Sequence, residues 1–206
     1  MVLLNVVDSM KLLRKYSIPV VKQEIVETPS RLKNACERIG FPLVMKIVSP
    51  KISHKTEVGG IKLNIHSLEE AKQAFSELKK LKGIESVLLQ KQLKGAEVIV
   101  GGKRDAQFGP TILFGLGGVF VEVFEDVSLR LCPITLRDAG KMVTEIKGFS
   151  VLKGFRGEKP ANISAIKQVL LKASEIMQKE KIKELDINPL IVDEKKAIAV
   201  DARIVV

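Results

Sequence analysis

Short runs of β-branched and apolar residues, several of them close neighbours along the chain, constrain the fold of this protein most strongly. Amphipathic stretches lie between them, so strands and helices are mixed without a regular alternation. This order favours an α+β fold with largely antiparallel sheets over an alternating parallel fold. The expected strands cover residues 43–48, 61–65, 87–89, 98–100, 111–114 and 119–123, followed by two near the C-terminus.

The clearest helix is expected to begin after residue 67. Ser67 and Glu70 have the spacing of a capping box, and Gly83 ends the apolar periodicity that follows them. Further helices are expected around Leu12 and Leu13, after Thr135, and over the apolar positions between residues 166 and 177.

The length of the chain limits the number of domains. It has 206 residues, of which 46% are hydrophobic, and this is enough to bury a core in one large domain or two small ones. A strand gives way to a Gly-containing turn near residues 90–95, which is the predicted boundary. The expected domains are therefore 1–90, which includes a short N-terminal helix, and 91–206.

The net charge of +10 would suit a partner rich in phosphate, such as a nucleic acid. However, the chain has no Trp and one Tyr, so the aromatic platforms on which single-strand binders stack bases are scarce. The lysines fall among glutamates in the expected helices, which is typical of solvated helix faces. Nucleic-acid binding is therefore not expected.

The sequence shows neither a targeting signal nor closely spaced cysteines. The first seven residues are apolar but lack a basic leader, and no uninterrupted apolar stretch is long enough to cross a bilayer. Cys36 and Cys132 lack the paired spacing of a zinc site, so reduced thiols are expected. These features predict a soluble, cytoplasmic protein that does not bind membranes.

Two apolar runs near the C-terminus flank the charged residues 193–196, a pattern that predicts a β-hairpin. Pairing Val192 with Ala197 across this turn places Asn188 opposite Asp201. Residues that face each other across a hairpin share one face of the sheet. The predicted register therefore brings the Asn188 amide and the Asp201 carboxylate together.

Asp186 precedes Asn188 by two residues and is expected on the same face. Two carboxylates and an amide oxygen are hard ligands that suit Mg²⁺. The alternative is that these are solvated residues at a strand end. Pro189 requires an edge strand or a bulge, and a bulge could shift the register.

Lys46 stands inside the apolar run 43–48, where its ammonium must reach solvent or meet an anion. The following loop, 49–60, carries hydroxyls, lysines and His54 and ends in two glycines, so it offers backbone N–H groups and cations to a phosphate. The alternative is that Lys46 extends to solvent and that His54 is an ordinary loop residue.

Two glycine-containing stretches, 101–110 and 114–118, match neither the P-loop nor the dinucleotide-binding motif. A hairpin turn is the preferred interpretation of Gly101 and Gly102 in the first stretch. In the second, Gly115, Gly117 and Gly118 lie between expected strands and leave room for a ligand to approach the backbone.

Taken in order along the chain, these motifs resemble the beta subunit of ADP-forming acetyl-CoA synthetase. That family is related to the beta subunit of succinyl-CoA synthetase and has the ATP-grasp fold. The resemblance implies two α+β subdomains with the nucleotide between them. The motifs are residues 42–46, SHKTEVGG at 53–60, residues 101–110, FGLGG at 114–118, LDINPL at 185–190 and VDAR at 200–203.

The resemblance also implies a division of labour. An acyl phosphate forms on an alpha subunit from acyl-CoA and phosphate, and a histidine of that subunit takes the phosphoryl group. A mobile phosphohistidine segment then carries it to ADP on the beta subunit. The implied cofactors are ATP or ADP with Mg²⁺, and the implied partner is an alpha subunit with the CoA-binding and phosphohistidine domains, in an assembly of two copies of each chain.

Residue roles follow from the same motifs. Lys46 would contact the nucleotide phosphates, and Asn188 and Asp201 would hold Mg²⁺. Asp186 would orient the incoming histidine, as a carboxylate orients a catalytic imidazole. His54 would be a candidate second carrier of the phosphoryl group.

Further nucleotide contacts are implied with less detail. Gln90, Lys91 and Gln92 would run past the adenine, and Glu97 would be another nucleotide contact. A succinyl-CoA synthetase beta chain is the nearest alternative, and the SHK loop in place of a Gly/Arg-rich loop argues against it. A regulatory subunit that binds nucleotide without turnover is the alternative from another class.

Overall fold

The computed structural model describes residues 2–49, 52, 58–118, 126–154 and 159–206. The chain forms two compact units. Unit 1 contains Met1–Val20 and Lys94–Val206, and unit 2 contains Val21–Leu93. No helix within the described ranges combines the length and the apolarity needed to span a membrane.

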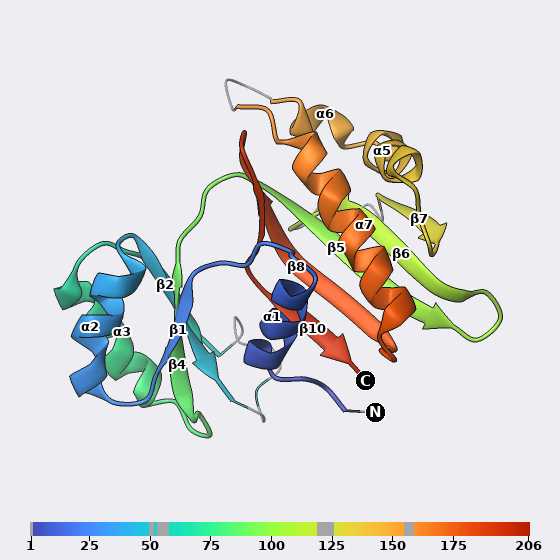
Figure 1. Ribbon diagram of the computed structural model, residues 1–206. Coiled ribbons are helices and arrows are strands. Elements are labelled where there is room, and N and C mark those ends of the chain that lie inside the picture. The colour runs from blue at the N-terminus through green and yellow to red at the C-terminus, as the bar shows by residue number, and fades with distance from the viewer. Residues whose placement is uncertain (1, 50–51, 53–57, 119–125, 155–158) are drawn as a thin grey trace. The chain divides into compact units, whose positions relative to one another are not determined.

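Unit 2 is an antiparallel sheet with helices on one face (Figure 1). Alternate residues of the central strand, Leu43, Met45 and Ile47, join the same buried cluster as apolar side chains from both helices. The strand order is β1-β4-β2-β3. The elements are β1 (Gln23–Val26), α2 (Pro29–Ile39), β2 (Leu43–Val48), β3 (Ile61–Ile65), α3 (Leu68–Lys79) and β4 (Ser86–Lys91).

Helix α3 begins as its sequence predicts. The Ser67 hydroxyl accepts a hydrogen bond from the Glu70 N–H at 3.1 Å. The Glu70 carboxylate, in turn, accepts from the N–H of His66 at 2.8 Å, one residue before the position that a strict capping box uses. Both residues of the expected motif therefore cap the helix, with one donor shifted by a residue from Ser67 to His66.

Unit 1 is built on a larger antiparallel sheet, in the order β10-β8-β5-β6-β7, with β9 also paired to β8. Its strands are β5 (Ala96–Asp105), β6 (Gly109–Leu116), β7 (Val127–Leu131), β8 (Glu184–Val192), β9 (Ala197–Ala199) and β10 (Ala202–Val205). Its helices are α1 (Val6–Lys15), α5 (Leu136–Glu145), α6 (Phe149–Leu152) and α7 (Ile163–Lys179).

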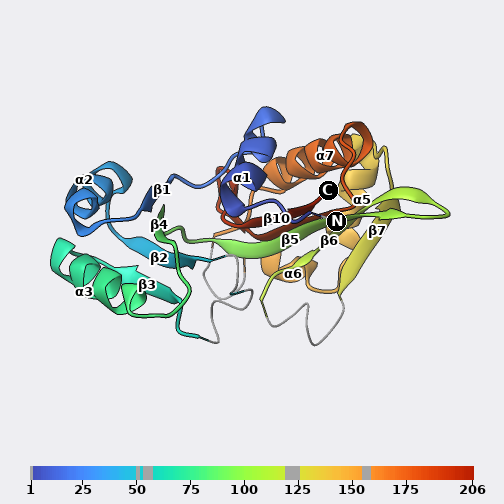
Figure 2. The ribbon, with the colours of Figure 1, turned by 90° about the horizontal axis from the view of Figure 1, so that it is seen from below.

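The core of unit 1 lies between this sheet and α7. Val100, Ile112 and Phe114 of the sheet are fully buried in one cluster with side chains of α1, α5 and α7. Figure 2 shows α1 and α7 on the same side of the sheet. The opposite face of β5, β6 and β8 is therefore left for residues that do not belong to the core.

The predicted α+β fold with antiparallel pairing is confirmed. The elements that were not predicted include β1, β7 and α2. Among the described residues β1 and β7 lie at the edges of their sheets, and each buries a single residue. Helix α2 has Pro29 in its first turn and Gly40 after its end, so its boundaries could have been read from the sequence. The strand expected at 119–123 lies outside the described residues.

The compact units divide the chain differently from the expected domains 1–90 and 91–206. The first twenty residues belong to unit 1, together with the C-terminal part of the chain. The reason is that Met10 and Leu13 of α1 are buried in the core of unit 1, and the Leu4 N–H donates to the Ile204 carbonyl at 2.9 Å. The second boundary, before Lys94, falls within the predicted 90–95 turn.

Gly95, in this turn, provides a test of the backbone geometry. Its φ is +151°, and a Cβ there would lie 2.4 Å from the Val192 carbonyl oxygen. Gly95→Ala is therefore expected to lower the free energy of unfolding by about 3 kcal/mol, because backbone atoms cannot move aside easily. Urea unfolding followed by circular dichroism measures it.

Gly140→Ala is the matched control. A Cβ at Gly140, inside α5, would meet only the flexible Lys167 side chain at 3.7 Å. Alanine is a better helix former than glycine, so this variant should gain roughly 0.5–1 kcal/mol. Equal stabilities of the two variants would contradict the described turn.

Candidate active site

The C-terminal hairpin has the predicted register. Val192 pairs with Ala197 across the turn, and the same register continues to the pair Ile187 and Ala202 on β10. Between these pairs, the Asn188 N–H donates to the Asp201 carbonyl at 3.2 Å. Asn188 and Asp201 therefore face each other, as the hairpin pattern indicated.

A bulge occurs at Pro189, as the sequence indicated. On β5, Val98 pairs with Leu190 and Val100 pairs with Ile187, so Asn188 and Pro189 together face a single β5 residue. The bulge lies on the β5 side, and the pairing of β8 with β9 and β10 keeps one register. This is why the predicted opposition of Asn188 and Asp201 is preserved.

The bulge shifts the buried positions along β8 by one residue. Leu185 and Ile187 are buried before it, and Leu190 and Val192 are buried after it. Asp186 alternates with the first pair and is half-buried, and the Asn188 that follows is exposed. Both polar residues thus lie on the sheet face that faces away from the core.

The Asp186 carboxylate lies in a mixed electrostatic environment. Burial raises its pKa above the ordinary value of an aspartate; Arg203 opposes this rise, and Asp201 adds to it. Arg203 pairs directly with Asp186 across β8 and β10. Sequence reasoning missed Arg203, although the register that paired Asn188 with Asp201 also pairs Arg203 with Asp186.

The donor set fits Mg²⁺ in kind. It offers the Asn188 amide oxygen and the Asp201 carboxylate, and Mg²⁺ is bound through one or two carboxylates, with water and substrate phosphate completing its shell. One oxygen of Asp201 accepts the Ala202 N–H at 2.8 Å, which fixes the carboxylate orientation. No cluster of three or more His, Cys, Asp or Glu residues suited to a metal occurs within the described ranges.

The glycines of the 114–118 stretch have two different explanations. A Cβ at Gly115 would lie 2.9 Å from a Val127 methyl group, and one at Gly117 would lie 3.0 Å from the Glu97 backbone. These two glycines are therefore required by close packing of protein atoms. Gly118, with φ +67°, has open space around it, and the nearest atom to a Cβ there would be Glu97 Oε2, at 4.0 Å.

Glu97 is tied to this stretch through its backbone. Its carbonyl accepts the Gly117 N–H at 2.7 Å, while its side chain is exposed. Of the predicted nucleotide contacts in unit 1, Glu97 and Gly118 are thus neighbours.

In unit 2, Lys46 and Gln90 share one sheet face. Val44 pairs with Gln90, and Lys46 pairs with Leu88. Lys46 and Gln90 therefore lie on the face opposite the residues of β2 that the helices cover. Lys46 is 7% exposed and Gln90 is 1% exposed. The Gln90 amide nitrogen donates to the Gln23 side-chain oxygen at 2.8 Å.

Lys91 and Gln92 differ from Gln90 in what their side chains contact. The Lys91 ammonium donates to the carbonyls of Gly40, at 3.3 Å, and Phe41, after the end of α2. Gln92 exchanges two hydrogen bonds with Asn64, at 2.7 and 2.8 Å. The period of two along a strand explains why three consecutive residues do not share one face. His54 lies outside the described residues.

Comparison with known proteins decides the family. The model of the ATP-grasp domain family matches residues 2–206. The chain is 44% identical to the beta subunit of ADP-forming acetate–CoA ligase I of Pyrococcus furiosus, over 96% of this chain and 89% of that one. This chain belongs to the beta-subunit family of ADP-forming acetate–CoA ligases.

Members of this ligase family also occur as longer chains. ADP-forming acetate–CoA ligase II of Archaeoglobus fulgidus is 46% identical over 97% of this chain, which spans 30% of that protein. The same domain therefore occurs both as a separate beta subunit and within a chain about three times as long.

Solved structures of dinucleotide forming acetyl-coenzyme A synthetase 1 from Ca. Korarchaeum cryptofilum share the fold. One, with coenzyme A, Ca-AMPCP and HgCl⁺, has a TM-score of 0.93 at 42% identity and covers 99% of this chain and 93% of that chain. Another, with coenzyme A and Mg-AMPPCP, has its phosphohistidine segment pointing towards the nucleotide binding site, with a TM-score of 0.89 at 41% identity over 99% and 92% of the two chains. The ATP-grasp fold expected from the sequence is confirmed.

Proposed function

We propose that this chain is the nucleotide-binding beta subunit of an ADP-forming acid–CoA ligase, which makes ATP from ADP through a phosphohistidine. The observation that carries this proposal is the hairpin, which brings Asn188 opposite Asp201 with Asp186 on the same face. Membership of the ligase family supports it.

Asn188 and Asp201 are the proposed Mg²⁺ ligands. The backbone bond from the Asn188 N–H to the Asp201 carbonyl holds the two residues opposite each other, and the Ala202 N–H orients the Asp201 carboxylate. When bound, Mg²⁺ neutralises charge on the nucleotide phosphates. The Mg-AMPPCP bound by the Korarchaeum enzyme supports this choice of metal. Lys46, whose stem is buried in β2, is the proposed phosphate contact in unit 2.

Asp186 is the proposed orienting carboxylate for the partner's phosphohistidine. With His54 as second carrier, the phosphoryl group passes from the partner's phosphohistidine to His54 and then to ADP. In each step a P–N bond breaks and the leaving imidazole keeps the nitrogen electron pair. The new bond to phosphorus is formed first by a ring nitrogen of His54 and then by a β-phosphate oxygen of ADP. A carboxylate that accepts the other ring N–H holds the imidazole in the required orientation. Arg203, paired with Asp186, keeps a positive charge beside this carboxylate.

The acyl and CoA chemistry is assigned to an alpha subunit, in an assembly with two copies of each chain. The relatives support this division, because the domain is a separate beta subunit in Pyrococcus furiosus and 30% of a longer ligase in Archaeoglobus fulgidus. The acid that the enzyme prefers would then be selected on the alpha subunit.

The isolated chain is expected to bind Mg·ADP and to show no ATP synthesis from acetyl-CoA, ADP and phosphate. Calorimetric titration with ADP measures binding, with EDTA replacing Mg²⁺ as the control. Activity should appear when an alpha subunit is added. Absence of binding in the presence of Mg²⁺, or robust turnover by the chain alone, would refute the proposal.

A further inference from the structure

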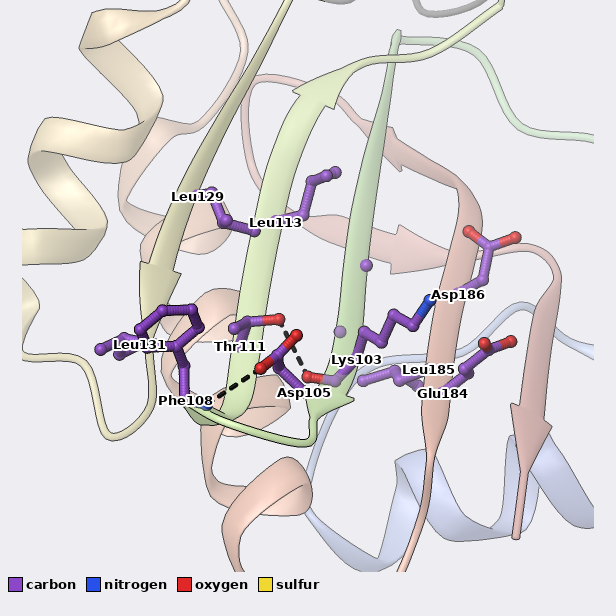
Figure 3. A pocket seen from close by; sticks show the side chains of 12 residues that line it. Lys103, Asp105, Phe108, Thr111, Leu113, Leu129, Leu131, Glu184, Leu185 and Asp186 are labelled. Atoms are coloured by element: carbon purple, nitrogen blue, oxygen red, sulfur yellow. Dashed lines mark hydrogen bonds between the residues drawn. The ribbon is translucent and has the colours of Figure 1, made fainter.

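An apolar groove lies on the face of the unit 1 sheet that is turned away from α7 (Figure 3). Its volume is about 520 Å³. One row of paired residues crosses it from strand to strand: Asp186 on β8, Gly101 on β5, Leu113 on β6 and Leu129 on β7. The groove is therefore continuous with the carboxylate that the proposed function places beside the reacting histidine.

Large apolar side chains in this groove are exposed to an unusual degree. Phe108 is 67% exposed, Leu129 is 55% and Leu131 is 54%. Edge strands such as β7 are ordinarily protected by charged residues or proline, and contiguous exposed apolar surface marks an interaction site. Removing this surface from water would stabilise a complex.

The floor of the groove is open because of a glycine. Gly101 lies in the paired row next to Leu113, and a Cβ there would be 3.6 Å from the Leu113 Cβ. A branched side chain at this position would fill the space that an incoming segment needs.

Phe108 is held in place at the tip of the hairpin between β5 and β6. The Asp105 carboxylate accepts the N–H groups of Gln107, at 2.8 Å, and Phe108, at 2.9 Å. Gly109, with φ +79°, completes the turn. An exposed aromatic side chain on an ordered turn is a suitable anchor for a protein partner.

The charges on the groove indicate what it binds. Asp105, Glu184 and Asp186 line it against one cation, Lys103, although the whole chain carries a net charge of +10. This local excess of carboxylates favours an apolar partner segment that carries basic residues.

We propose that the groove docks the alpha-type subunit, through an extended apolar segment with basic residues that lies on Leu113, Leu129 and Leu131 against Phe108. The inference rests on the proposed function, because a phosphohistidine that reaches Asp186 arrives at one wall of this groove. Docking there would hold the phosphorylated segment close to the carboxylate that orients it.

The test uses the alpha-type subunit that co-purifies with this chain from its source. Its Kd for the wild-type chain is compared with those for L129S/L131S, F108S and G101V, which remove or fill the groove. We expect the Kd to rise by about 30-fold or more for L129S/L131S, while Mg·ADP affinity stays within about twofold. Leu136→Ser is the matched control, because Leu136 is 51% exposed at the start of α5 and does not line the groove.

Every outcome of this test bears on one of the two proposals. Thermal unfolding confirms that the variants are folded, and an unchanged Kd in folded L129S/L131S and G101V overturns the inference while leaving the proposed function intact. Failure of any alpha-type subunit to co-purify, or failure of the wild type to bind Mg·ADP, overturns the proposed function itself. Self-association of the wild type that L129S/L131S abolishes would assign the groove to a second copy instead.

Discussion

Replacing Asp201 by alanine is expected to raise the Kd of Mg·ADP by about 30-fold or more. The Asp201 carboxylate lies opposite Asn188, and these two side chains supply the protein oxygens proposed for Mg²⁺. Removing one of two ligands, and the only charged one, should remove most of the metal-dependent affinity. Calorimetric titration with ADP, with and without Mg²⁺, separates this loss from any loss of direct nucleotide contacts.

Asp193→Ala is the control, because it removes the same charge from the same hairpin. The Asp193 carboxylate accepts the N–H groups of Lys195, at 2.7 Å, and Lys196, at 2.9 Å, within the turn. These bonds lower the pKa of Asp193 and hold its carboxylate within the turn. We expect a loss of about 1 kcal/mol of stability and less than a twofold change in the Kd of Mg·ADP. Equal losses of affinity in both variants would place the metal elsewhere.

Replacing His54 by alanine is expected to lower phosphoryl transfer from the alpha subunit to ADP by about 10³-fold or more, with the Kd of Mg·ADP within about threefold. The expectation rests on the sequence, in which His54 lies among hydroxyls and lysines just before two glycines. A nucleophile that carries the phosphoryl group contributes to the transition state more than to ground-state binding. The measurement is trapping of a base-stable, acid-labile phosphate on the chain, together with ATP synthesis.

His66→Ala is the matched control in the same assays. The His66 side chain is exposed, and the bond it makes to Glu70 at the start of α3 comes from its backbone N–H, which alanine retains. This variant should keep full activity. Full activity in His54→Ala would remove His54 from the mechanism, whereas weaker nucleotide binding with residual turnover would make it a phosphate contact.

The hairpin illustrates how a local pattern can predict a site. Period-two alternation and a short charged turn determine which residues face each other, so the sequence alone is enough to pair Asn188 with Asp201. The same register contains Arg203 opposite Asp186, a pairing that the search for metal ligands alone overlooked. The helices at 68–79 and 136–145 were likewise predictable. Their N-cap residues, Ser67 and Thr135, directly precede them and bond to residues of the first turn.

Nonlocal contacts account for what the sequence could not predict. The side-chain partners within the predicted adenine-contacting stretch, Gln90 to Gln92, are an example: Lys91 donates to carbonyls after α2, and Gln92 bonds to Asn64. Val127 packs against Gly115 and Glu97 packs against Gly117, two glycines at which a ligand is predicted to approach the backbone. Each of these partners is distant in the sequence, so no local pattern identifies it.

The sequence by itself therefore determined the α+β fold, the family and the pairing within the C-terminal hairpin, because these depend on periodicity, turns and motif order. Only the tertiary structure decided that α1 belongs with the C-terminal part of the chain, that a bulge at Pro189 shifts the buried positions of β8 from Leu185 and Ile187 to Leu190 and Val192, and that Leu113, Leu129 and Phe108 form one groove. The physical reason is that sheet order and burial bring together residues up to about two hundred positions apart, and that these contacts, rather than local propensity, select the face on which each side chain lies.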